Sequence, residues 1–464
     1  MRVLRAAVVL GVSTPLVVLG CGADDGTARQ PAVGGEGGEA IGASGASGAG
    51  AAGSPIGGDS SQGGSPSVDG GSPSGGTPDM AGQPTGGAGG APSEPEPVCG
   101  DAQADGALVC FGAPQPLSLV EGSPLDMAIG EWDALEGRDL IVASNGGLRY
   151  FSNTAGVLET ETYVGAAGTV LAAGQLSSEG DLDLLLGQAD NSTVVAFGGG
   201  DGLVSASETG TFGYEGQLYN YSVADVAGTG PSQDFVVTYG STVTVVITSG
   251  NEGEGFQTHF DSVYPQSPLD SVLAKLGSSQ WLVYSSQGNL ERRLVTYDLG
   301  AVTVADEAEP VTAVGGSPAQ LDLGDFNEDG FSDVAATLTD SGDVSVLFGD
   351  GTEAGDFALV EDEKRFLTLT IGTSDQAKTQ RDVKVGDFTG DGHADLAVSV
   401  HGLDAVAIFA GDGQGAFSAP ELLNTGAGSG PARLAVGDLN DDGVDDLAVL
   451  GETSSKVIVL LSNP

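Results

Sequence analysis

Three short segments of this sequence carry acidic, amide and hydroxyl side chains at spacings that suit a metal ion. They read DFNEDGFSD at 325–333, DFTGDGHAD at 387–395 and DLNDDGVDD at 438–446. In each segment the oxygen-bearing side chains fall at positions one, three, five and nine, and the glycine at position six permits a sharp turn. Hard oxygen ligands of this kind, together with a backbone carbonyl at position seven, suit Ca²⁺. The sequence therefore predicts up to three calcium sites.

The predicted ligands follow the same pattern in all three loops. They are Asp325, Asn327, Asp329, Phe331 and Asp333; Asp387, Thr389, Asp391, His393 and Asp395; and Asp438, Asn440, Asp442, Val444 and Asp446. The residue at position seven contributes only its carbonyl. Because a threonine hydroxyl is a weaker ligand than Asn or Asp, we expect the second site to be the weakest. Bound calcium is expected to stabilise the loops, whose carboxylates otherwise repel one another; the alternative is a set of solvated Asx turns.

The loops belong to a repeat of about fifty residues. The segments at 323–336, 385–398 and 436–449 share the pattern G-D-[FL]-x-x-D-G-x-x-D-[LV]-A, and weaker copies lie at 129–143, 173–187, 223–237 and 272–286. Short strands rich in Val, Leu, Ile and Thr, divided by Gly and Asp turns, indicate four-stranded antiparallel blades. We therefore expect an all-β fold, a seven-bladed β-propeller over residues 111–464. The first loop positions are Glu131, Gln175, Asp225, Lys275, Asp325, Asp387 and Asp438.

The two ends of this region predict how the ring closes. The last unit stops one strand short, at VIVLLSNP, whereas residues 111–133 resemble residues 417–440, which leave one unit and begin the next. Residues 111–120 are thus expected to complete the seventh blade.

The three strong segments, together with VSVLFGDGTEAGDF (344–357) and VAIFAGDGQGAF (406–417), resemble the FG-GAP and VCBS repeats of integrin-type propellers and many secreted bacterial proteins. This resemblance implies a recognition surface for a protein or a glycan, at the loop-bearing faces or the central channel.

The upstream loops have lost most of these acids. Gln175, Ser177, Glu179 and Asp183 form a weaker candidate set, while Lys275 puts a cation where the metal would sit. We expect no metal in the fourth blade.

The N-terminus indicates export. Residues 1–20 have two arginines and a short apolar run, as in a signal peptide. Val18-Leu19-Gly20-Cys21 resembles the lipobox of bacterial lipoproteins, which implies a lipidated Cys21; the alternative is an ordinary signal followed by a stray cysteine. Gly22 follows that cysteine in place of the Asp that favours inner-membrane retention in many enterobacterial lipoproteins. In a cell with two membranes we therefore expect an outer-membrane lipoprotein, facing either the periplasm or the exterior. Residues 21–98 contain no aromatic side chain and are rich in Gly, Ser, Ala and Pro, so we expect a disordered tether.

Cys99 and Cys110 remain as an even pair eleven residues apart. In an exported chain this favours a disulfide that pins the incoming segment 99–110, the alternative being two unpaired thiols.

Charge and composition limit the function. With 64 Asp and Glu against 15 Lys and Arg, the formal net charge is −49, which excludes nucleic-acid binding through a basic face. The three histidines, His259, His393 and His401, assemble into no catalytic constellation, so we expect a binding or adhesion module with an unidentified protein or glycan ligand. The alternatives are a polysaccharide lyase or hydrolase and a structural partner in an envelope complex. Possible sugar-binding aromatics are Trp132, Trp281, Tyr214, Tyr219 and Tyr221.

Overall fold

The computed structural model describes Cys99 and most of residues 108–463. The gaps are 120, 133–136, 155, 160–161, 166–167, 177–181, 199–204, 211–216, 226–232, 252–254, 299–300, 312–313, 352–355 and 358–365. The chain divides into two units, Met1–Ala88 and Gly89–Pro464, and every described residue belongs to the second. The predicted signal peptide at 1–20, Cys21 and the tether at 21–98 lie outside the described residues.

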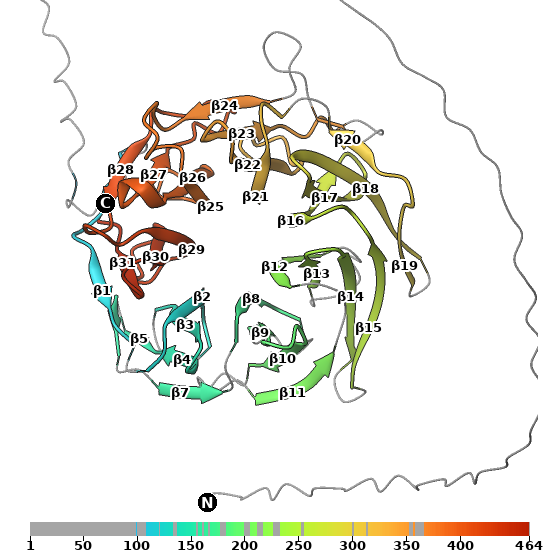
Figure 1. Ribbon diagram of the computed structural model, residues 1–464, viewed down its shortest axis with the longest axis horizontal. Helices are drawn as coiled ribbons and strands as arrows, with labels where there is room; N and C mark the ends of the chain where they lie inside the picture. Colours follow the sequence, from blue (N-terminus) through green and yellow to red (C-terminus); the bar gives the residue numbers. More distant parts are fainter. Residues whose placement is uncertain are drawn as a thin grey trace, which may run out of the picture. The chain divides into compact units, whose positions relative to one another are not determined.

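Seven antiparallel sheets are arranged as the blades of a ring (Figure 1). The all-β, seven-bladed prediction is therefore confirmed. Blade 1 contains β2 (Pro124–Gly130), β3 (Asp139–Ser144), β4 (Gly147–Phe151) and β7 (Thr162–Gly165), with a hairpin of β5 (Asn153–Thr154) and β6 (Val157–Leu158). Blade 2 contains β8 (Val170–Gly174), β9 (Asp183–Gly187), β10 (Thr193–Phe197) and β11 (Ser205–Gly210). Blade 3 contains β12 (Leu218–Ala224), β13 (Asp234–Tyr239), β14 (Val243–Asn251) and β15 (Gly255–Val263).

The remaining blades follow the same order from the inner to the outer strand. Blade 4 contains β16 (Pro268–Leu276), β17 (Ser279–Ser286), β18 (Asn289–Asp298) and β19 (Ala301–Val304), and β20 (Glu309–Val311) also pairs with β18. Blade 5 contains β21 (Pro318–Gly324), β22 (Asp333–Leu338), β23 (Asp343–Leu347) and β24 (Leu367–Thr370). Blade 6 contains β25 (Gln380–Gly386), β26 (Asp395–Val400), β27 (Ala405–Phe409) and β28 (Glu421–Asn424), with a 3-10 turn at His401–Leu403. Blade 7 contains β29 (Pro431–Gly437), β30 (Asp446–Gly451), β31 (Lys456–Leu460) and β1 (Gln115–Leu117).

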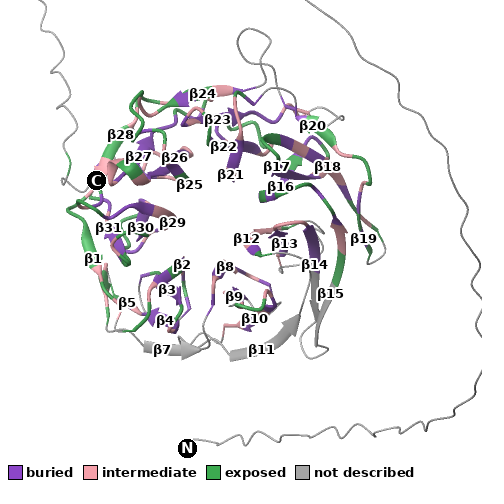
Figure 2. Ribbon diagram, viewed as in Figure 1, coloured by how far each residue is buried: buried purple, intermediate pink, exposed green. Residues whose placement is uncertain are grey.

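The second strand is buried along its whole length in six of the seven blades. All residues of β3, β9, β13, β22, β26 and β30 are buried, because each blade is covered on both faces by its neighbours (Figure 2). This explains why these strands read as continuous apolar runs, whereas one-sided sheets alternate apolar and polar residues.

The hydrophobic core is divided into seven clusters, and each lies between two successive blades. One cluster joins Leu276 and Val283 of blade 4 to Leu321 and Val334 of blade 5. The other clusters join the remaining neighbours in the same way, including blade 7 to blade 1. A domain of this length is too large for one ordinary core. The repeat divides the apolar side chains among seven smaller cores, one at each blade interface.

Strands from both ends of the described region close the ring, as predicted. β1 pairs antiparallel with β31, with Pro116 opposite Ile458. Gly112 N donates to Leu461 O at 2.8 Å, and Asn463 N donates to Cys110 O at 2.9 Å. A disulfide with an S–S distance of 2.07 Å joins Cys110 to Cys99. The seventh blade is therefore held together by segments more than 300 residues apart in the sequence.

Among the described residues, no helix has the length and apolar character needed to cross a membrane.

Deleting residues 111–120 should destabilise the propeller. The deletion removes β1 and exposes the edge of β31, with a loss of about 0.5–1.5 kcal/mol for each hydrogen bond that is not replaced. Thermal unfolding followed by circular dichroism should show a lower melting temperature. Deleting ten residues at 41–50, within the Gly- and Ala-rich N-terminal segment, is the control and should leave the melting temperature unchanged. Equal melting temperatures for the two deletions would contradict closure by β1.

Candidate functional site

A buried aspartate begins the second strand of six blades. Five of these residues share one set of printed contacts, and we call them the brace aspartates: Asp139, Asp183, Asp333, Asp395 and Asp446. Each is 0% exposed. One carboxylate oxygen accepts the backbone N–H of the second residue of the loop between strands one and two, and the other accepts an N–H just beyond strand three. In blade 5, for example, Asp333 accepts from Phe326 N at 2.8 Å and Gly349 N at 2.8 Å.

The brace aspartates include three predicted metal ligands, those at position nine. The same two contacts occur at Asp139 and Asp183, in blades whose loops lack most of the other acids. The carboxylate at position nine therefore has a structural use that is independent of metal. The pKa of Asp333, Asp395 and Asp446 is raised to about 7, mainly by burial and to a smaller extent by other acids of each loop.

The other oxygen-bearing side chains of loops 325–333 and 438–446 turn inward and bind backbone N–H groups. Asp325 accepts from Asp329 N at 3.0 Å and from Gly330 N at 2.9 Å, and Asn327 Oδ1 also accepts from Asp329 N. Asp438, Asn440 and Asp442 make the equivalent contacts in the last loop. These contacts place the side chains of positions one, three and five around one centre, close to the N–H groups of the turn.

Loop 387–395 has a related but different arrangement. Asp387 accepts from Gly390 N at 2.6 Å and from Gly392 N at 2.8 Å, while Asp391 accepts from His393 N at 3.0 Å. Thr389 is 2% exposed, and its hydroxyl oxygen has no hydrogen-bond partner. A buried hydroxyl without a partner costs free energy, which a bound cation would offset.

The three loops fit calcium by the chemistry of their donors. The side chains at positions one, three, five and nine offer only oxygen atoms to a cation, apart from the amide nitrogens of Asn327 and Asn440. The glycine at position six has a φ of +84° in Gly330, +84° in Gly392 and +88° in Gly443, as the predicted sharp turn requires. Within the part of the chain that the structure describes, no three His, Cys, Asp and Glu side chains are gathered as a metal centre. Calcium binding would therefore exchange the contacts to backbone N–H groups for contacts to the ion.

The first loop position also links neighbouring blades, which sequence reasoning missed. Asp387 N donates to Asp445 Oδ2 at 3.0 Å, and Asp445 N donates back to Asp387 O at 2.8 Å. The same exchange joins Gln175 to Gln233 and Lys275 to Ser332. Lys275 thus takes part in a link to blade 5 in the loop where we expect no metal. His393 Nδ1 lies 2.5 Å from Glu328 Oε1 in the preceding loop, and this contact raises the pKa of the histidine.

A second group of charges lies on the inner strands, and the sequence analysis did not find it. We call Asp126, Asp270, Asp322 and Asp382 the channel aspartates. Each accepts the N–H of a residue on the inner strand of the next blade, namely Leu171, Leu321, Val385 and Leu434, at 2.8–2.9 Å. Burial raises the pKa of Asp270 to about 6. The signal was present in the sequence, because three of these residues, Asp126, Asp270 and Asp382, are the third residue of their inner strand.

Two cations lie among the channel aspartates. Lys384 Nζ is 3.8 Å from Asp382 Oδ1. Arg433 donates through Nη1 to Gln320 Oε1 at 3.1 Å and through Nη2 to Tyr219 O at 3.4 Å, so a side chain of blade 7 reaches blades 5 and 3. Attraction to Asp126, Asp382 and Asp270 raises the pKa of Arg433 against the opposing effect of burial.

Most of the aromatic side chains suggested for sugar binding belong to the core. Trp132, Trp281 and Tyr221 are buried, and Arg292 stacks on the Trp281 ring at 4.5 Å. Tyr214 lies outside the described residues, and Tyr219 lines a cavity at the channel mouth.

The FG-GAP-like repeat family matches residues 325–398 and 387–449, which run from the loop of blade 5 to the second strand of blade 7. The chain carries FG-GAP-like repeats. The resemblance stated from the sequence is thus confirmed, and the repeats form a seven-bladed propeller. The match covers the three loops with the full set of acids.

One solved structure has a similar fold at low identity. The chain is similar to BBS1N in a crystal structure of its complex with ARL6DN, soaked with lead, with a TM-score of 0.51, 11% identity, and coverage of 76% of this chain and 96% of that chain. A mercury-soaked crystal of that complex has a TM-score of 0.49 with the same identity and coverage. At 11% identity the similarity shows the fold alone. No curated protein matches the sequence.

Replacing the brace aspartate of blade 2 should destabilise this FG-GAP-like propeller even without metal. Asp183→Ala removes the acceptor of Gly198 N and leaves Leu176 N with only its contact to Gly174 O, at a total cost of about 1–3 kcal/mol. Chemical denaturation in EDTA should show this loss of unfolding free energy. Asp190→Ala, in the same blade, removes a local contact to Ser192 and should cost well under half as much. Equal losses of unfolding free energy for Asp183→Ala and Asp190→Ala would contradict a structural role specific to the brace aspartate.

Proposed function

We propose that this FG-GAP-like propeller is a calcium-stabilised binding module that a lipid on Cys21 holds at the outer membrane of a bacterial cell envelope. The fold is consistent with a binding module. The observation that carries the binding role is the channel mouth at the start of the inner strands. Two cavities of about 440 and 460 Å³ lie there, and both are lined by Arg433. Pockets of this size suit a small ligand or a protruding group of a larger one.

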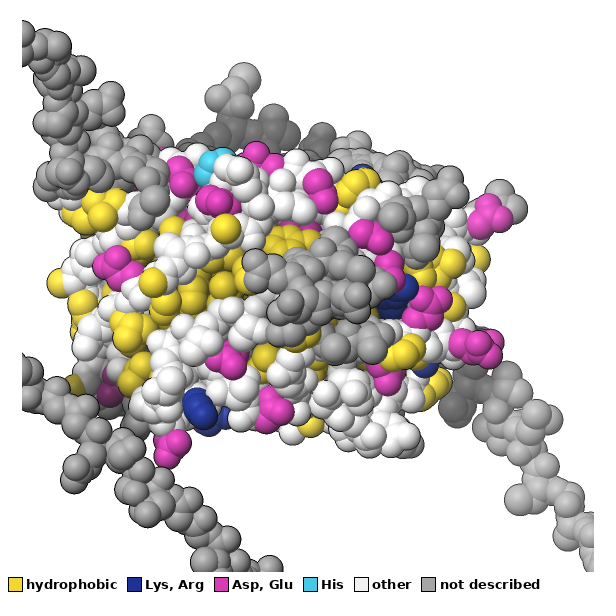
Figure 3. Space-filling model, turned by 90° about the horizontal axis from the view of Figure 1, so that it is seen from above, with side chains coloured by type: hydrophobic (Ala, Val, Ile, Leu, Met, Phe, Trp, Pro, Cys, Tyr) yellow, Lys and Arg dark blue, Asp and Glu magenta, His cyan; other side chains and the backbone are white. Residues whose placement is uncertain are grey.

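The calcium proposal rests on the different roles of the loop acids. The aspartate at position nine binds its two backbone N–H groups both in blades whose loops carry the other acids and in blades whose loops lack them. Positions one, three and five carry side-chain oxygens together in blades 5, 6 and 7, where they contact only the turn itself and its neighbouring segments. Acidic side chains also predominate over basic ones on the face shown in Figure 3. A cation at each of the three loops would reduce the repulsion among carboxylates there.

Calcium should raise the stability of the wild-type protein through the side chains at position one. At a concentration 100 times its dissociation constant, an ion that binds only the folded state adds about 2.7 kcal/mol per site. Metal-stripped protein should therefore melt at a higher temperature in CaCl₂ than in EDTA. The triple variant Asp325→Asn, Asp387→Asn, Asp438→Asn should lose this difference.

Asp183→Ala is the control, because it should lower the melting temperature in both conditions and keep the calcium-dependent difference. A wild-type protein that melts at the same temperature with and without calcium would refute the calcium sites.

Lipidation at Cys21 predicts membrane association. Cys21→Ala should leave an unprocessed, unlipidated precursor, because the thiol is the atom that carries the acyl chains. Metabolic labelling with a radioactive fatty acid and fractionation of the envelope measure the two effects, with Cys99→Ala as the control that should still be labelled. Fatty-acid labelling of the Cys21→Ala variant would count against the anchor.

The binding role itself is tested with purified full-length protein on a glycan array and on immobilised envelope proteins. Saturable binding that an excess of free propeller abolishes is the expected result. Absence of saturable binding to both classes would refute the binding module.

A further inference from the structure

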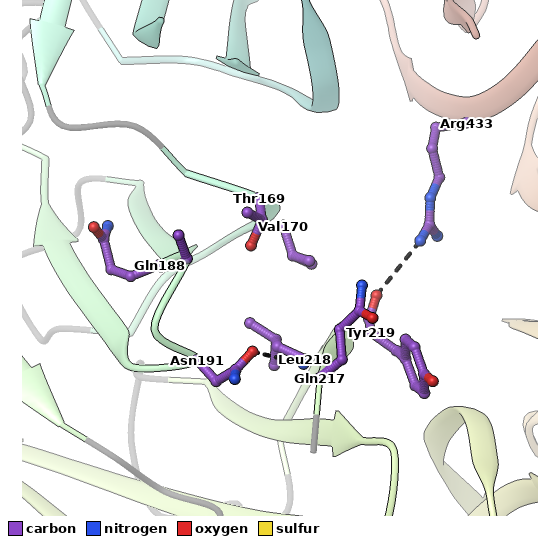
Figure 4. A pocket seen from close by; sticks show the side chains of 9 residues that line it. Thr169, Val170, Gln188, Asn191, Gln217, Leu218, Tyr219 and Arg433 are labelled. Atoms are coloured by element: carbon purple, nitrogen blue, oxygen red, sulfur yellow. Dashed lines mark hydrogen bonds between the residues drawn. The ribbon is translucent and has the colours of Figure 1, made fainter. Parts of the chain in front are cut away.

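We propose that the cavity between blades 2 and 3 at the channel mouth binds a neutral saccharide unit. This inference rests on the proposed binding function and assigns it a place and a ligand class. The cavity has a volume of about 440 Å³ and lies at the start of β8 and β12 (Figure 4). It is at the end of the inner strands opposite the metal loops, which follow the ends of those strands. The two candidate sites are therefore separate.

The lining of the cavity suits hydroxyl groups. Three carboxamides, from Gln188, Asn191 and Gln217, share the wall with Thr169, and no carboxylate is among the described residues that line the cavity. This composition is unusual in a chain with 64 acidic residues against 15 basic ones. A carboxamide both donates and accepts hydrogen bonds, as sugar hydroxyls do. The lining therefore fits a ligand with many hydroxyls and no charge.

The three amides differ in their availability to a ligand. Gln188 Nε2 is buried without a hydrogen-bond partner, and its amide points away from Arg433 in Figure 4, so it does not face the space in front of that side chain. Gln217 is exposed, and its amide points toward the space in front of Arg433 in Figure 4. Asn191 has a different role, because its Oδ1 accepts from Leu218 N at 3.1 Å and holds the start of β12 in place. Its φ of +66° is in the left-handed region, which is uncommon for a residue other than glycine.

Apolar side chains complete the lining. Val170 and Leu218 lie on the cavity wall beside the amides (Figure 4). A sugar ring has an apolar face of C–H groups as well as its hydroxyls, so a wall of mixed aliphatic and amide groups complements both parts of the ring. An apolar ligand would leave the amides without partners, at a cost that disfavours it.

The charge on Arg433 does not make the cavity a site for acids. Its guanidinium closes the cavity on the channel side through its contacts with Tyr219 O and Gln320. Asp126, Asp270 and Asp382 act on the same guanidinium. Together with Asp322 and Lys384, these residues form a cluster of four carboxylates and two cations. The guanidinium is thus already attracted to carboxylates of this protein, which reduces its attraction for a carboxylate ligand, whereas a neutral ligand does not depend on that attraction.

The test measures binding of maltotetraose, cellotetraose, mannotetraose and tetragalacturonate to the full-length protein by saturation-transfer NMR and calorimetry. We expect at least one neutral tetrasaccharide to bind and tetragalacturonate to bind more weakly. Ala189→Phe places a large ring at the exposed edge of the cavity, and Gln217→Ala removes one amide. Each should weaken binding about tenfold or more, which corresponds to about 1.4 kcal/mol.

Matched controls lie on the opposite face of the propeller. Gln414→Ala and Ala416→Phe change the same residue types at exposed positions in the turn after β27, and both should leave binding unchanged. Melting temperatures of all four variants show whether the fold is retained.

Three results would overturn the proposal. No neutral tetrasaccharide binds at millimolar concentration, the acidic tetrasaccharide binds most tightly, or a neutral one binds equally well to Ala189→Phe and Gln217→Ala. In the last case the binding function stands and only this cavity is refuted. Saturable binding of envelope proteins without any sugar binding would likewise refute the saccharide and leave the binding module intact.

Discussion

A buried carboxylate at the start of the second strand is the contact on which each of these blades depends. It satisfies two backbone N–H groups that the turn between strands one and two and the end of strand three would otherwise leave unpaired in the interior. An aspartate has the reach to do this, and both of its oxygens are acceptors when it is ionised. The contact recurs in blades 1, 2, 5, 6 and 7. The loop between strands one and two can therefore differ from blade to blade in its remaining acids without losing this contact.

Blade-to-blade contacts turn this local unit into a ring. Apolar clusters fill each of the seven interfaces, and the channel aspartates bind the backbone of the next blade at four of them. Further backbone links in the loops between strands one and two join blades 2 to 3, 4 to 5 and 6 to 7. Each blade thus relies on its neighbours for its burial, and the pairing of β1 with β31 is what lets the last blade contribute as fully as the others.

The two ends of the inner strands have different chemistry. One end leads into the loops, where acidic side chains gather in blades 5 to 7. The other end opens at the channel mouth, where Arg433 spans from blade 7 to blades 3 and 5 and lines the cavities on both of its sides. A cation that stabilises the first end and a ligand that occupies the second would therefore act on separate parts of the same blades. Propellers share this architecture without sharing a ligand, so the function resides in these side chains and not in the fold.

The sequence by itself determined the number of blades, their strand order and the closure of the ring. Those features follow from patterns that repeat every fifty residues or so, and from the likeness of residues 111–133 to 417–440. It also located the loop oxygens and the glycine turns, because these are local spacings within nine residues. Only the tertiary structure decided that position nine braces the fold, since the N–H groups it binds come from two different strand connections. The Arg433 contacts and the mouth cavity were also beyond the sequence, because their partners come from separate blades and meet only when the ring is closed.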